Sequence, residues 1–153
     1  MAALLTDKGY EVVRASRNTQ PSLNLNDPAS IDAFYKTLGE VDAVICTAPQ
    51  GGGGFGPITG FSDEVIDSYT RSKLLGQVNL VRKGLSTIRP GGVFILTGGM
   101  SGFLPIPKAS FIAMLNTDGA LYPSTATVAE TYLKALEDRN TGQPVFVEGY
   151  GPR

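Results

Sequence analysis

Residues 42–47 read DAVICT and residues 93–97 read VFILT, and these two short runs decide the fold. Each has the length of a strand, and each is apolar along most of that length. Continuous apolar runs are typical of strands that are buried on both faces of a parallel sheet. A helical pattern lies between them, from Ser62 to about Ile88. The segment therefore predicts a strand, a long helix and a second strand.

The segment between the two runs has the spacing of an amphipathic helix. Ser62 precedes Asp63 and Glu64, and this combination is typical of a capped helix start. Pro90-Gly91-Gly92 follows the helix and is expected to end it. The apolar residues recur at roughly helical spacing. They are Val65, Ile66, Tyr69, Leu74, Val78, Val81 and Leu85.

Further strands and helices alternate on both sides of this unit. Asp27 is the expected cap of another helix, which has Pro28 at its first position. This alternation predicts an α/β fold, with a doubly wound parallel sheet in a three-layer αβα sandwich. The other expected elements are a helix over 1–9, strands over 10–15 and 22–25, a helix over 27–38, a Gly-rich loop over 49–60, a helix over 126–136 and a strand over 144–148.

The composition limits the classes of function. The chain has 153 residues, 42% of them hydrophobic and 18% charged, as expected of one globular domain. The net charge is −1, so no basic surplus is present to neutralise nucleic-acid phosphates. The absence of histidine excludes His-based triads and the common zinc sites, and a single cysteine excludes an internal disulfide. We find no membrane-spanning run or targeting signal, and expect a cytoplasmic protein without nucleic-acid or membrane partners.

Six segments occur in an order and at a spacing that one protein family shares. Together they resemble the short-chain dehydrogenase/reductase family, a Rossmann-fold group that uses NAD(H) or NADP(H). The helix sequence SKLLGQVNL is similar to that of a divergent branch of short members, which lack the usual catalytic tyrosine. The six segments are EVVRASRN (11–18), LNLNDPASI (23–31), VDAVICTAP (41–49), SKLLGQVNLVR (72–82), GGVFILTGGMSG (91–102) and TATVAETYLKALEDRNTGQPVFVEGYG (125–151).

The resemblance implies a set of cofactor-binding residues. Arg17 follows the family's second strand, where a basic residue favours the 2′-phosphate of NADP, since a guanidinium pairs with phosphate in a bidentate fork. The resemblance thus implies NADP rather than NAD. Asn24 and Leu25 match the pair beside the adenine ring. Residues at the ends of the fourth and fifth strands line the path of the cofactor, where small side chains let the backbone approach it. These residues are Thr47, Ala48, Pro49, Thr97 and Gly98.

The resemblance also implies Lys73 and Ser101 as the catalytic candidates. Lys73 matches a helix asparagine that supports the family's proton relay, and a lysine with a pKa lowered by burial can act as an acid or a base. Gly99 stands where the family has its catalytic serine, so Ser101 is the nearest substitute. The family's tyrosine would fall near Phe111 or Ile112, which cannot transfer a proton, and no Tyr-x-x-x-Lys pair occurs in the chain.

Two parts of the family's fold have no counterpart in the sequence. The first strand and the Gly-rich turn that binds the cofactor's pyrophosphate would precede Met1. The fifth helix and the sixth strand would fall between about Ala109 and Tyr122. We expect residues 1–153 to form one NAD(P)-binding Rossmann-like domain without these parts. Such a sequence is either a truncated or differently spliced product, or part of a longer chain.

The resemblance implies an oxidoreductase that interconverts a small carbonyl compound and an alcohol with NADP(H). The missing turn, tyrosine and serine favour an alternative, a catalytically silent nucleotide-binding or regulatory relative, or an inactive truncated product. Family members associate through their fourth and fifth helices. A homodimer through the helix at 62–88 is therefore expected as well.

Overall fold

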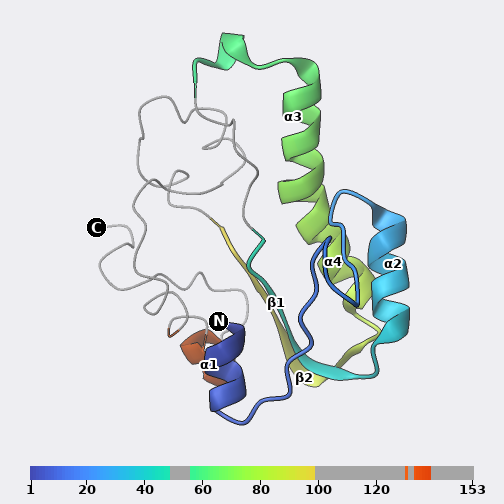
Figure 1. Cartoon of the computed structure of the whole chain (residues 1–153), viewed down its shortest axis with the longest axis vertical. Coiled ribbons are helices and arrows are strands. Elements are labelled where there is room, and N and C mark those ends of the chain that lie inside the picture. The colour runs from blue at the N-terminus through green and yellow to red at the C-terminus, as the bar shows by residue number, and fades with distance from the viewer. Residues whose placement is uncertain (49–55, 99–129, 131–132, 139–153) are drawn as a thin grey trace.

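The computed structural model has the strand–helix–strand unit at its centre. Strand β1 (Val41–Cys46) pairs in parallel with β2 (Ile88–Leu96), and a long helix connects them. Helices α2 (Pro28–Thr37) and α4 (Gly76–Gly84) lie on one side of the two strands, and α1 (Ala2–Asp7) lies on the other (Figure 1). The chain therefore has the expected α/β architecture. The structure describes residues 1–48, 56–98, 130 and 133–138.

The helices begin at the expected caps. The Asp27 carboxylate accepts a hydrogen bond from the N–H of Ala29 at 2.9 Å, at the start of α2. The Ser62 hydroxyl accepts one from the N–H of Val65 at 3.4 Å, at the start of α3 (Asp63–Tyr69). Each cap satisfies a donor that the first helical turn would otherwise leave unpaired. Short-range sequence signals alone therefore set these two boundaries.

Helix α3 continues through a π-helical turn, η2 (Thr70–Leu75), into α4. The helix ends at Gly84, earlier than the expected end near Ile88. Because Ile88 already pairs with Val41 in the sheet, the chain must turn before it. The sequence Pro90-Gly91-Gly92 was expected to break the helix, but it lies in β2, where the register between the strands shifts.

The long helix buries only part of its apolar stripe, because Tyr69 is buried while three other members are exposed. Leu74, Val78 and Leu85 are 48%, 50% and 62% exposed. The helix turns its small residues inward instead, and a Cβ atom on Gly76 would lie 2.8 Å from the carbonyl oxygen of Leu25. Such a close approach requires glycine, so backbone packing overrides the apolar periodicity. The buried face consists of Tyr69, Lys73, Gly76, Leu80 and Gly84.

The core lies between α2, α4 and the strands. Tyr35 donates its hydroxyl proton to the carbonyl oxygen of Leu80 at 2.7 Å, and its ring fills the space where a Cβ atom on Gly84 would lie. Burial raises the pKa of Tyr35 to about 12, so the phenol remains a donor at neutral pH. The ion pair between Lys83 and Asp32, at 2.6 Å, also joins α4 to α2. The buried residues of this core are Ile31, Phe34, Tyr35, Cys46 and Leu80.

Two expected strands, at 10–15 and 22–25, are not formed. A single parallel bridge between Ser16 and Ser22 is present there. The N–H of Leu23 bonds back to the carbonyl oxygen of Ser16 at 2.9 Å, so this part of the chain closes on itself in a turn. A strand needs a neighbouring strand to pair its backbone groups, and apolar sequence alone does not provide one.

The remaining expectations have mixed outcomes. Strand β1 matches DAVICT within one residue, but its residues are mostly half-buried rather than buried on both faces. Helix α1 lies within the helix expected over 1–9. Residues 130 and 133–137 are helical, inside the helix expected over 126–136 and one residue beyond it. The strand expected over 144–148 lies outside the described residues.

Candidate functional site

The carboxyl ends of β1 and β2 meet at one edge of the sheet, and Thr97 joins them. The backbone N–H of Thr97 donates to the carbonyl oxygen of Cys46 at 3.1 Å, and its hydroxyl donates to the same oxygen at 2.6 Å. Thr47 and Gly98, which follow these strands, are exposed. In open α/β sheets, ligands bind just outside the carboxyl ends of the strands. This edge is therefore the candidate site.

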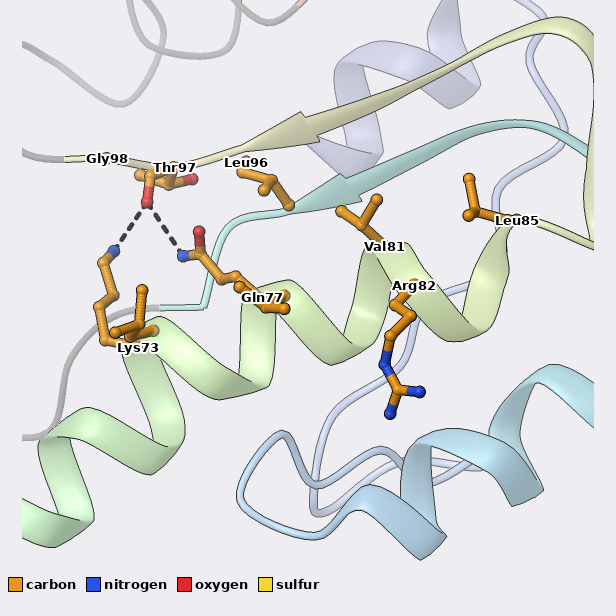
Figure 2. A pocket seen from close by; sticks show the side chains of 10 residues that line it. Lys73, Gln77, Val81, Arg82, Leu85, Leu96, Thr97 and Gly98 are labelled. Carbon is orange, nitrogen blue, oxygen red and sulfur yellow. Dashed lines mark hydrogen bonds between the residues drawn. The ribbon is translucent and has the colours of Figure 1, made fainter.

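Lys73 reaches this edge from the π-helical turn. Its ammonium group donates to the carbonyl oxygen of Thr97 at 2.7 Å, and the residue is only 7% exposed. Gln77 donates its amide N–H to the same oxygen at 3.1 Å, as Figure 2 shows. Sequence reasoning missed Gln77, although residues four apart on a helix share a face and its spacing from Lys73 was readable.

A groove of about 610 Å³ runs from this edge along α4. Lys73, Gln77 and Thr97 form its polar end, and apolar side chains together with Arg82 line the rest (Figure 2). Arg82, farther along the helix, donates to the Asn79 side chain at 3.0 Å. The groove therefore combines a cationic, hydrogen-bonding end with an apolar wall. The apolar lining consists of Leu74, Val78, Val81, Leu85 and Leu96.

Cys46 lies behind the strand ends with its thiol buried. Burial raises the pKa of this thiol, and the backbone N–H of Ala48 and the nearby Lys73 ammonium oppose the rise only in part. The thiol therefore stays protonated at neutral pH and is a poor nucleophile. Cys46 contributes to the core and to the backbone of the site rather than to reactive chemistry.

Three residues of the implied cofactor set lie in the segment between α1 and α2. Arg17 is exposed in the turn over 16–22, where its carbonyl oxygen accepts a hydrogen bond from Ser22 at 3.4 Å. Asn24 is held locally, because its N–H donates to Ser30 at 2.9 Å. Leu25 packs against the core and against Gly76. In the described part of the chain, no hydrogen bond links Arg17 or Asn24 to the strand ends.

The implied site is therefore only partly assembled in what the structure describes. Thr47, Ala48, Thr97 and Gly98 come together at one edge with Lys73. Pro49 and Ser101 lie outside the described residues, as do the positions near 99 and 111–112 where the family's serine and tyrosine would fall. Over the described ranges, no group of three or more Cys, Asp or Glu side chains could hold a metal ion. No helix within those ranges is long and apolar enough to cross a membrane.

Solved structures with similar folds include several dehydrogenases and reductases. The protein lin1944 from Listeria innocua is 26% identical, with a TM-score of 0.68 over 98% of this chain and 78% of that one. A small-chain dehydrogenase in complex with NADPH is 23% identical, with a TM-score of 0.64 over 88% of this chain. A carbonyl reductase from Pseudomonas aeruginosa PAO1 is 14% identical, with a TM-score of 0.78 over 90% of this chain and 84% of that one.

The chain spans only part of some of these proteins. It covers 58% of the small-chain dehydrogenase that holds NADPH, and 59% of a second small-chain dehydrogenase. A short-chain dehydrogenase/reductase from Burkholderia multivorans with bound NADP is matched over 60% of its length, at 13% identity and a TM-score of 0.66. No family model and no curated protein sequence matches the chain.

Proposed function

We propose that this chain, which has the fold of the short-chain dehydrogenases and reductases, is an oxidoreductase that binds NADP(H) at the carboxyl ends of β1 and β2. One observation carries the proposal. The ends of two adjacent parallel strands bring together three residues that are implied for the cofactor site, Thr47, Thr97 and Gly98. The Lys73 ammonium lies beside them. Similar structures that hold NADPH or NADP support the choice of cofactor.

The chemistry of this edge suits a dinucleotide. Thr47 and Gly98 are exposed and small to medium in size, so a ligand can approach the backbone there. The ammonium of Lys73 provides positive charge at the same edge. Arg17 is exposed on its turn, and a guanidinium there would bind the 2′-phosphate that distinguishes NADP from NAD. When bound, the cofactor supplies or accepts a hydride.

Lys73 is the residue that we propose for proton transfer. Its ammonium lies at the strand ends, where it donates to the carbonyl oxygen of Thr97 at 2.7 Å. In this proposal the ammonium bonds to the carbonyl oxygen of a small aldehyde or ketone and gives it a proton as the alcohol forms. Ser101 remains a predicted partner outside the described residues.

The second candidate function is a silent nucleotide-binding relative. One observation favours it: the side chains of Lys73 and Gln77 both donate to a main-chain oxygen, that of Thr97. Groups used in this way stabilise the fold whether or not a reaction takes place. The same edge would then bind the nucleotide without reducing a substrate.

Thermal unfolding with cofactor separates these functions. We expect NADPH at roughly 100 times its Kd to raise the free energy of unfolding by about 2.7 kcal/mol, because it binds only the folded chain. NADH at the same concentration should stabilise less, and Arg17→Ala should reduce the difference between the two. Stabilisation without turnover on a panel of aldehydes and ketones would favour the silent relative. An unfolding curve unchanged by either cofactor would contradict both.

We also propose that two copies associate through the helix expected over 62–88, on the face that carries three exposed apolar residues. Leu74, Val78 and Leu85 are exposed along the groove, and such a stripe is typical of a protein–protein contact. Light scattering at micromolar concentration should give twice the mass of the 16.1 kDa chain, and Val78→Asp should give a monomer. A monomeric wild-type chain would contradict this proposal.

A further inference from the structure

We propose that Gln77 is a positioning residue that orients the Lys73 ammonium. Both side chains donate to the carbonyl oxygen of Thr97, Lys73 at 2.7 Å and Gln77 at 3.1 Å (Figure 2). A carbonyl oxygen has two lone pairs, so it can accept both bonds at once. The inference rests on the proposed function, because there the Lys73 ammonium acts on the substrate.

The acceptor is itself held in place. Thr97 is tied to the end of β1 by its N–H and its hydroxyl, which both donate to the carbonyl oxygen of Cys46. The peptide group that follows Thr97 carries the shared oxygen and leads into Gly98, beyond the end of β2. A glycine allows this peptide wide rotation. The bond from Gln77 restricts that rotation from the helix side.

Lys73 needs such a fixed acceptor. Its ammonium sits on a flexible four-carbon stem with rotatable donors, so the stem alone does not set its direction. Gln77 lies four residues later on the same helix and is half-buried, so its amide reaches the same oxygen from the same face of the helix. With the oxygen of Thr97 held by Gln77, the Lys73 ammonium that donates to this oxygen keeps a defined position.

The test compares two amide replacements on α4. Gln77→Met removes the donor and keeps the length of the side chain. Asn79→Leu removes an amide that, in the described part, bonds only to Arg82, so it is the matched control. In each variant we would measure the carbonyl ¹³C shift of Thr97, the ¹³Cε shift of Lys73, the Kd for NADPH, and kcat and KM for a small aldehyde.

Gln77→Met should shift both resonances and lower kcat roughly three- to tenfold, the range that corresponds to one hydrogen bond. KM and the Kd for NADPH should change less, and Asn79→Leu should leave all these values near wild type. Unchanged resonances in Gln77→Met would overturn the proposal, as would shifted resonances with an unchanged kcat.

If the wild-type chain has no turnover, the proposed enzymatic function fails. The Lys73 resonance then decides the positioning role alone: a shift confined to Gln77→Met supports it, and no shift overturns it.

Discussion

Replacing Lys73 with methionine should lower kcat for NADPH-linked carbonyl reduction by about 100-fold or more, the usual contribution of a positioned acid or base. Methionine keeps the apolar stem and removes the ammonium. The N–H and the hydroxyl of Thr97 would keep their bonds to the carbonyl oxygen of Cys46, so the strand ends should stay joined. We therefore expect the Kd for NADPH to change far less than kcat. Steady-state kinetics and a binding titration measure the two effects separately.

Lys83→Met is the matched control for this prediction. Lys83 is on the same helix, but its ammonium pairs with Asp32 on α2, away from the strand ends. Its loss should lower stability slightly, by up to about 1 kcal/mol, because the pair is partly exposed. It should leave kcat near wild type. Equal kcat values for Lys73→Met and the wild-type chain would show that Lys73 has only a structural role.

Replacing Leu80 with alanine should lower the free energy of unfolding by about 2–5 kcal/mol, the range for deleting a fully buried leucine side chain. Leu80 is 2% exposed and packs in the core with Ile31 and Tyr35. The buried side chains around Leu80 come from α2 and β1, which are held by their own backbone hydrogen bonds. These side chains can therefore fill the cavity only in part. Chemical denaturation of the wild-type and variant chains measures the loss.

Val78→Ala is the comparison that tests which face of α4 is buried. Val78 is 50% exposed in the single chain, so its truncation should cost well under 1 kcal/mol at a concentration where the chain is monomeric. A cost that grows with protein concentration would reflect association through α4. Equal costs for Val78→Ala and Leu80→Ala in the monomer would contradict the packing described here.

Two helix starts and the ends of the two strands could be predicted from the sequence. Asp27 and Ser62 cap helices in the structure as expected, because a cap depends on groups only two or three residues away. The apolar runs at 42–47 and 93–97 form adjacent strands that end within one residue of the expected ends, although β2 begins earlier than expected, at Ile88. The edge where both strands end could therefore be located, and Thr97 and Lys73 meet there.

Other features depend on contacts that no local pattern records. Val78 belongs to the apolar residues that recur at helical spacing, yet it is 50% exposed, because Gly76 and Gly84 allow the opposite face to approach Leu25 and Tyr35 more closely than any side chain would permit. The run at 10–15 has strand composition, yet in the described chain it lacks a neighbour that would pair with its backbone.

The sequence by itself determined the α/β class, the two strands and the helix starts, which follow from interactions between residues close in the chain and from apolar periodicity. Its resemblance to a family implied the strand ends where a ligand is expected. Only the tertiary structure decided which face of α4 is buried and that Gln77 shares the carbonyl oxygen of Thr97 with Lys73. These depend on how closely two backbones approach and on where a strand ends beside a helix, and both are set by packing between distant segments.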